Sequence, residues 1–318
     1  MEQIQHRHVD IRGLKHHIAE IGTGSVVVVF LHGFPEIWYT WRHQMIAVAD
    51  AGFRAIAPDC RGYGLSEQPP EPEKASFMDL VEDLVAMLDL FGISKTFLVS
   101  KDFGVFTASL FAVLHPERLL GFITLGLPFI TLGSKTVGKD LLPEGFYVSR
   151  WQEPGRAEAD FGRFDVKTVV RNIYILFSKS EIPIAAEHQE IMDLVDPSTP
   201  LPPWFTDDDL TAYATLYEKS GFRLPLQVPY RTMNEELGMS ITEPKVQVPA
   251  LLIMGEKDYV FKFPGIRDSI KSGKVKENVP ELEITFIPEG SHFVQEQFPD
   301  QVNKLIISFL KKNSTAGK

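Results

Sequence analysis

The sequence predicts an α/β fold, in which a mostly parallel central sheet has helices on both faces and carries a helical cap insertion. Two observations lead to this prediction. Short, fully apolar runs such as residues 26–31 have the pattern of strands that are buried on both faces of a sheet. Stretches with apolar residues at helical spacing alternate with these runs, which is typical of parallel strands joined by crossover helices. With 318 residues, 44% of them hydrophobic and 23% charged, the chain can bury a large core.

The expected elements follow one another in a regular order. Strands are expected at residues 26–31, 53–57, 96–99, 119–125, 249–254 and 282–287. One helix is expected around residues 80–91, with Ser76 and Asp79 as its N-terminal capping pair and Gly92 as its end. Two more helices are expected at residues 104–114 and 300–310.

The alternation of strands and helices is interrupted in the middle of the chain. From about residue 128 to about residue 246, longer helical or irregular segments carry scattered Pro, Trp and Tyr. We therefore expect the first part of a core domain at residues 1–127, a helical cap at 128–246 and the second part of the core at 247–318.

Charge and cysteine content exclude some classes of protein. The net charge of −10 argues against nucleic-acid binding, which normally needs a basic surface. The single cysteine, Cys60, has no partner for an intramolecular disulfide and fits a reducing compartment. The first residues do not have the pattern of a secretory signal, and the longest apolar run, residues 26–31, is too short to span a bilayer. We expect a cytoplasmic protein with no membrane span.

A nucleophilic carboxylate is expected directly after the strand at residues 96–99. The segment Ser100-Lys101-Asp102-Phe103-Gly104 has the form small-x-nucleophile-x-Gly of a strained turn that joins a strand to a helix. The flanking residues must be small because a bulky side chain there would collide with the neighbouring strand or helix. The alternative is that Asp102 merely caps the helix that follows.

Two later loops favour the nucleophile. Asp258 follows the strand at residues 249–254, and His292 follows the strand at residues 282–287. The carboxyl ends of parallel strands meet at one edge of a sheet, so we expect these side chains to lie close to Asp102. The chain order of nucleophile, acid and histidine is that of the triad in the α/β-hydrolase fold, which is therefore the fold class we expect.

The turn that follows the strand expected at residues 26–31 is expected to complete the site. Backbone N–H groups of Phe34 in this turn and of Phe103 after the nucleophile are expected to form an oxyanion hole, which stabilises the charge that develops during ester hydrolysis. The bond between Phe34 and Pro35 is a candidate cis peptide.

Several segments together resemble those of the soluble epoxide hydrolases, most closely the plant type. They are residues 32–36 (HGFPE), 38–44 (WYTWRHQ) and 57–64 (APDCRGYG), together with the triad loops. The resemblance implies a hydrolase acting on ether bonds, which converts an epoxide and water to a vicinal diol through an alkyl ester on Asp102. It implies no metal and no organic cofactor. It also implies that Tyr147 and Tyr230, which match the two cap tyrosines of that family, bind the epoxide oxygen.

Both neighbours of Asp102 depart from the family pattern, which usually reads His-Asp-Trp-Gly. Phe103 weighs against a haloalkane dehalogenase, the nearest alternative, because those enzymes share the fold and the aspartate but commonly hold the halide with that tryptophan. For Lys101 we expect an ion pair with Glu36, the alternative being a lysine that faces solvent. A slow or non-catalytic ligand-binding protein of the same fold is the other alternative, against which the intact triad argues.

The expected substrate is a small apolar epoxide of the lipid or terpenoid type. This expectation depends on aromatic residues of the cap, which in other proteins are more often part of the core; they are Trp151, Phe177, Trp204 and Phe205. The sequence leaves open the natural substrate, the selectivity and whether the protein is a monomer or a homodimer.

Overall fold

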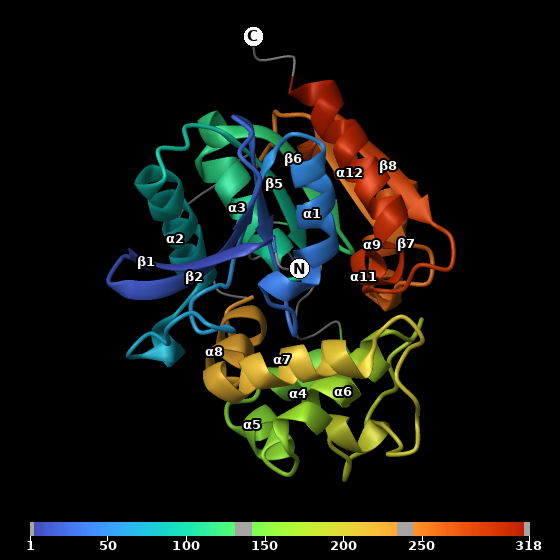
Figure 1. Ribbon diagram of the computed structural model, residues 1–318. Coiled ribbons are helices and arrows are strands. Elements are labelled where there is room, and N and C mark those ends of the chain that lie inside the picture. Colours follow the sequence, from blue (N-terminus) through green and yellow to red (C-terminus); the bar gives the residue numbers. More distant parts are fainter. Residues whose placement is uncertain (1–2, 131–141, 234–243, 315–318) are drawn as a thin grey trace.

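A single eight-stranded sheet forms the centre of the molecule (Figure 1). The computed structural model describes residues 3–130, 142–233 and 244–314. The strand order is β1-β2-β4-β3-β5-β6-β7-β8, in which β1 and β2 pair antiparallel, β2 and β4 pair antiparallel, and all other neighbours are parallel. The strands are β1 (Gln5–Ile11), β2 (Leu14–Ile21), β3 (Val27–Leu31), β4 (Arg54–Pro58), β5 (Thr96–Lys101), β6 (Leu119–Leu125), β7 (Ala250–Gly255) and β8 (Leu282–Ile287).

Helices cover both faces of this sheet, as the sequence predicts. In Figure 1, α1 and α12 lie together on one face, whereas α2 and α3 lie on the other. The described helices of the core are α1 (Arg42–Asp50), α2 (Phe77–Leu90), α3 (Gly104–Leu114), α9 (Ile266–Lys271), α10 (Val275–Asn278), α11 (Val294–Gln297) and α12 (Pro299–Asn313). No helix in the described ranges is both long enough and apolar enough to cross a membrane.

The segments predicted from apolar runs agree closely with the observed elements. The strand at 119–125, the strand at 282–287 and the helix at 104–114 have the expected bounds. The capping box of Ser76 and Asp79 is present at the start of α2. The hairpin of β1 and β2 was not predicted, because β1 is a largely exposed edge strand whose sequence has no apolar run.

The described residues between β6 and β7 form helices and turns, which we call the helical insertion. In Figure 1 these helices gather below the sheet. They are α4 (Tyr147–Gln152), α5 (Arg156–Phe161), α6 (Val166–Phe177), α7 (Asp207–Ser220) and α8 (Arg223–Leu226), followed by a π-helical turn at Gln227–Arg231. Part of the expected cap, residues 131–141 and 234–243, lies outside the described residues.

Candidate active site

Asp102 occupies a strained turn between β5 and α3. Its backbone has a φ of 50°, in the left-handed region that few residues other than glycine adopt. The turn is crowded: a Cβ atom on Gly104 would lie 2.6 Å from the carbonyl oxygens of Leu31 and His32. A Cβ atom on Gly33 would lie 2.4 Å from Oδ1 of Asp102. The small residues of these two motifs therefore allow the backbone to approach the carboxylate closely.

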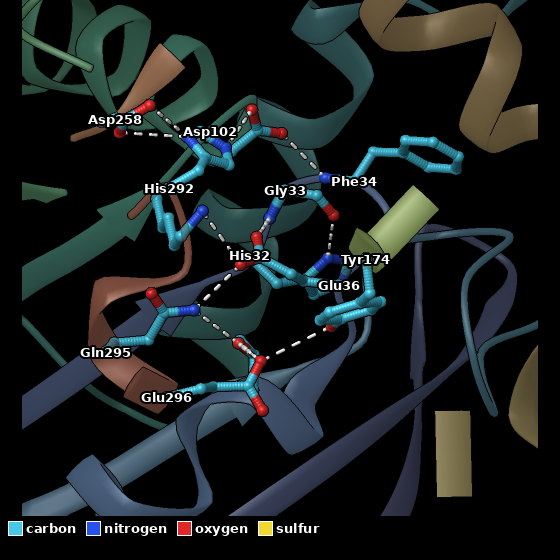
Figure 2. Close-up of polar contacts among 12 residues, drawn as sticks. His32, Gly33, Phe34, Glu36, Asp102, Tyr174, Asp258, His292, Gln295 and Glu296 are labelled. Carbon is cyan, nitrogen blue, oxygen red and sulfur yellow. Dashed lines mark hydrogen bonds and ion pairs between the residues drawn. The ribbon is translucent and has the colours of Figure 1, made fainter. Parts of the chain in front are cut away.

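The three residues predicted to form the triad are in contact (Figure 2). Nε2 of His292 lies 3.3 Å from Oδ2 of Asp102. Nδ1 of the same ring lies 3.0 Å from Oδ1 and 3.1 Å from Oδ2 of Asp258. All three side chains are buried, and they come from the ends of β5, β7 and β8, which run parallel. The expected meeting of these loops at one edge of the sheet is confirmed.

Electrostatic interactions oppose the effect of burial at both Asp102 and His292. Burial alone would raise the pKa of Asp102, but its hydrogen bond and charge interaction with His292, together with the Lys101 ammonium, lower that pKa below its usual value. Burial alone would lower the pKa of His292, but the charge of Asp258 and the hydrogen bonds to Asp102 and Asp258 together outweigh burial and raise that pKa to about 9. Asp102 is therefore an anion at neutral pH, next to a histidine that favours its protonated form.

A backbone donor holds one oxygen of the Asp102 carboxylate. The N–H of Phe34 donates to Oδ1 at 2.9 Å, and the Phe34–Pro35 bond is cis, as expected. Phe103 is the N-cap residue of α3, directly after Asp102, as the elbow motif requires. The N–H of Phe34, one of the two donors predicted for the oxyanion hole, thus contacts the carboxylate directly.

The expected ion pair between Lys101 and Glu36 is present. Nζ of Lys101 lies 3.1 Å from Oε1 of Glu36, in a contact that lacks hydrogen-bond geometry, and both side chains are fully buried. The alternative of a solvent-facing lysine is therefore wrong. Oε2 of Glu36 accepts the N–H of Gly33 at 3.2 Å, and Oε1 accepts Nε2 of Gln295 at 2.9 Å (Figure 2). Glu36 thereby connects the residue before Asp102 to the turn that carries Phe34.

The two tyrosines predicted to bind an epoxide oxygen belong to the helical insertion, and their rings pack edge to face. Tyr147 begins α4, Tyr230 lies in the π-helical turn, and their ring centroids are 6.1 Å apart. The ring of Tyr230 also packs 5.1 Å from that of Phe103. The hydroxyl of Tyr230 is buried and has no hydrogen-bond partner among the described residues. An unsatisfied buried hydroxyl is costly unless a ligand completes it.

A cavity of about 30 Å³ adjoins Asp102 and is mainly apolar. Its polar lining groups are Asp102, Tyr147 and Tyr259. Tyr259 is a residue that the sequence reasoning missed, although its position directly after Asp258 was a signal that could have revealed it. Its hydroxyl lies 3.2 Å from that of Tyr147.

The aromatic residues expected to line the pocket divide into two groups. The rings of Trp151 and Phe177 pack 5.2 Å and 4.9 Å from the ring of Tyr147, which lines the cavity, but neither of them is among the described residues that line it. Phe205 stacks instead on another tyrosine, Tyr174, and the tilted ring of Trp204 lies 6.3 Å from that tyrosine. In the described part of the chain, no three His, Cys, Asp or Glu side chains are grouped so as to hold a metal ion.

A second cluster of buried charge joins the core to the helical insertion. Arg42 donates to Oε2 of Glu296 at 2.6 Å and to Oδ1 of Asp209 at 2.9 Å. Oε1 of Glu296 accepts Thr40 at 3.1 Å and Tyr213 at 3.0 Å. Asp209 and Tyr213 belong to α7, whereas the other three residues belong to the core. We call these five residues the core–insertion network.

The fold and this arrangement define a class of protein, and comparison with known proteins specifies it further. The sequence matches the alpha/beta hydrolase fold family over residues 26–299. Epoxide hydrolase 2 of Siraitia grosvenorii is 37% identical over 98% of this chain and 100% of its own. A crystal structure of an epoxide hydrolase from Vigna radiata is 38% identical, has a TM-score of 0.90, and is matched over 98% of this chain and 99% of its own. Epoxide hydrolase I of potato (Solanum tuberosum) is 33% identical with a TM-score of 0.87, over 97% of this chain and 99% of its own. The chain belongs to the epoxide hydrolases of the α/β-hydrolase fold.

Proposed function

We propose that this protein converts a small apolar epoxide and water to a vicinal diol through a covalent ester on Asp102. The observation that carries the proposal is the unequal environment of the two carboxylate oxygens. Oδ1 accepts the N–H of Phe34, whereas Oδ2 faces Nε2 of His292 at 3.3 Å. Oδ2 is therefore the attacking oxygen, and Oδ1 becomes the carbonyl oxygen of the ester.

In the first half-reaction, Oδ2 attacks a ring carbon and the bond from that carbon to the epoxide oxygen breaks. The hydroxyls of Tyr147 and Tyr230 donate hydrogen bonds to the epoxide oxygen, and one of them supplies the proton that neutralises the alkoxide. The carboxylate needs no base because the pKa of Asp102 is lowered.

In the second half-reaction, neutral His292 takes a proton from water, and the resulting hydroxide attacks the carboxyl carbon of the ester. The N–H groups of Phe34 and Phe103 stabilise the charge on Oδ1. The bond between that carbon and Oδ2 then breaks, and His292, oriented by Asp258, returns a proton to the departing oxygen. The diol leaves with the original Oδ2, and an oxygen from water takes its place in Asp102. The second proton of that water leaves the Asp102 carboxyl group and restores the phenol of the tyrosine that protonated the alkoxide.

The order in which these bonds form and break gives a direct test of the proposed function. Single turnover of styrene oxide or a fatty-acid epoxide in heavy-isotope water should place the heavy oxygen in the peptide that contains Asp102. The His292→Gln variant should accumulate the ester, detected as an intact mass raised by the mass of the epoxide. Diol formation with all heavy oxygen in the diol, and no mass gain in His292→Gln, would contradict the ester route.

Three further properties belong to the same proposal. Residues 128–246 are the cap, between core segments 1–127 and 247–318, and the cap supplies both epoxide-binding tyrosines. The lone Cys60 supports a cytoplasmic location. The substrate is of the lipid or terpenoid type, supported by the apolar lining beside Tyr147, and the protein acts as a monomer or a homodimer.

A further inference from the structure

Tyr259 brings a third hydroxyl to the pair of tyrosines. It begins the turn Tyr259–Lys262 in the core, whereas Tyr147 belongs to the helical insertion. Their hydroxyl oxygens are 3.2 Å apart, and their rings are nearly perpendicular, at 80°. This hydrogen bond therefore joins the core to the insertion inside the site.

The position of Tyr259 is fixed by its neighbours. Asp258 caps the same turn by accepting the N–H of Val260 at 2.9 Å, so the acid and Tyr259 are held by one local structure. The ring of Tyr259 packs 4.8 Å from that of His292 and 5.4 Å from that of Phe177. Its side chain is buried and lines the same cavity as Asp102. A change in its hydroxyl therefore acts at the reacting centre.

Counting donors gives the direction of the hydrogen bond. A phenol has one O–H donor and can accept through its oxygen. If Tyr147 donates its only proton to an epoxide oxygen, then the contact at 3.2 Å requires Tyr259 to donate to Tyr147. Tyr230 has no such partner among the described residues. The two epoxide-binding tyrosines are therefore not equivalent.

We infer that Tyr259 is a positioning residue for epoxide opening, which donates to the oxygen of Tyr147 and so makes Tyr147 the stronger of the two proton donors. The inference rests on the proposed function. A phenol oxygen that accepts a hydrogen bond is a better donor through its own proton, because the bonds polarise one another. As the proton moves towards the alkoxide, the negative charge that grows on Tyr147 is stabilised by the O–H of Tyr259.

The pKa directions agree with this assignment. Burial raises the pKa of both phenols, and the hydrogen bond between them lowers that of Tyr147 while it raises that of Tyr259. Tyr259 is thus the member of the pair that keeps its proton.

A double-mutant cycle tests the inference. In single-turnover experiments with styrene oxide, Tyr259→Phe should lower the rate constant of ester formation about tenfold, the value of one hydrogen bond, with little change in substrate affinity. In a Tyr147→Phe background the same substitution should have no further effect, because the acceptor is gone. In a Tyr230→Phe background the tenfold loss should persist. A purely structural role would give equal losses in both backgrounds.

Two further measurements keep the outcomes distinct. Tyr259→Leu removes the donor as well and should show the same dependence on Tyr147, which provides a second variant if Tyr259→Phe unfolds below the assay temperature. An unchanged rate of ester formation in Tyr259→Phe, or equal losses in the two backgrounds, overturns the inference. If the unmodified protein still forms diol in that case, the proposed function remains intact. No diol and no ester from any epoxide would instead mean that the proposed function itself is wrong.

Discussion

The candidate active site and the core–insertion network are both clusters of buried charge, and the short segment from His292 to Glu296 contributes one residue to each. The hydrogen bonding of the two clusters differs. In the core–insertion network, Glu296 accepts hydrogen bonds from four side chains, Arg42 at 2.6 Å, Tyr213 at 3.0 Å, Thr40 at 3.1 Å and, from outside the network, Tyr174 at 3.5 Å. At the candidate active site, Asp102 accepts one backbone N–H at 2.9 Å, and the other partner of its carboxylate among the described residues is His292, at a longer 3.3 Å. Both carboxylates are almost fully buried, so the difference is one of partners and not of exposure.

The comparison separates structural charge from reactive charge. A carboxylate with all its lone pairs hydrogen-bonded must lose some of those bonds before it can attack, which makes it a poor nucleophile. Asp102 has an oxygen that is nearly free for attack, and its burial without an arginine costs stability that the fold must supply elsewhere. We therefore expect substitutions at Asp102 to change activity, and substitutions in the core–insertion network to change stability.

The largest expected effect is the loss of activity in Asp102→Asn. The amide keeps the shape of the side chain and tolerates the positive φ, but it is not a nucleophile. We expect diol formation to fall by at least about 10³-fold, with the free energy of unfolding changed by less than about 1 kcal/mol. Steady-state rates and chemical denaturation measure the two quantities, with the amide verified by intact mass.

The exposed Asp50 provides the matched control for this variant. Asp50→Asn makes the same chemical change at the end of α1 and should alter neither quantity. A strongly destabilised Asp102→Asn with substantial remaining turnover would reverse the comparison between the two clusters.

The next largest effect is expected in the core–insertion network. Arg42→Met leaves Glu296 and Asp209 buried without their common cation, which should cost about 3–5 kcal/mol of unfolding free energy. At a temperature where the variant remains folded, turnover per folded molecule should stay within about threefold of the original, because Arg42 does not touch Asp102 or His292 in the described contacts.

A second arginine also joins the insertion to the core but at an exposed position. Arg223 of α8 pairs with Glu73 at 2.7 Å, and both side chains are more than half exposed. Arg223→Met should cost less than about 1 kcal/mol. Equal destabilisation by the two substitutions would show that burial does not distinguish the core–insertion network from an ordinary surface pair.

A pH effect of about tenfold is expected at His292. Its pKa in the folded protein is about 9, so the protonated ring stabilises the fold; this stabilisation is complete below about pH 6.5 and is lost as the pH rises through about 9. Ester hydrolysis needs the neutral ring, so its rate should rise with pH. Because the ester no longer carries the Asp102 charge, the midpoint of that rise should lie below 9.

Separate measurement of the two half-reactions tests this expectation. Rapid-quench experiments across pH 6–10 give the rate of ester formation and the rate of ester hydrolysis independently. Ester formation should show no rise with pH in this range, because Asp102 is already ionised. A hydrolysis rate independent of pH would exclude His292 as the base.

The sequence predicted the active-site cluster better than the core–insertion network, for a physical reason. Asp102, Asp258 and His292 each follow an apolar strand, and parallel strands bring their carboxyl ends together, so local patterns sufficed. Arg42 and Glu296 are 254 residues apart, and neither lies in a motif that indicates a charged partner. The hydrogen bond between Tyr259 and Tyr147 could not be predicted from the sequence either, because it depends on how the insertion packs on the core. Tyr147 and Tyr230 were predicted only from the resemblance to a known family, because composition does not distinguish them from other tyrosines.

The smallest expected effect concerns Lys101, which has properties of both a structural and a reactive charge. It pairs with Glu36 as a structural charge does, yet it acts on the reactive groups Asp102 and His292. Its ammonium lowers the pKa of both Asp102 and His292. Lys101→His removes a permanent positive charge, so the pKa of His292 should rise and the midpoint of ester hydrolysis should move to higher pH. At pH 7 we expect hydrolysis to slow by about two- to fivefold, because less of the ring is neutral, while ester formation changes less. Lys95→His, at an exposed position near the start of β5, is the matched control and should leave the pH profile unchanged. An unchanged profile in Lys101→His as well would mean that the pair with Glu36 neutralises Lys101 completely, and that this lysine is a structural charge alone.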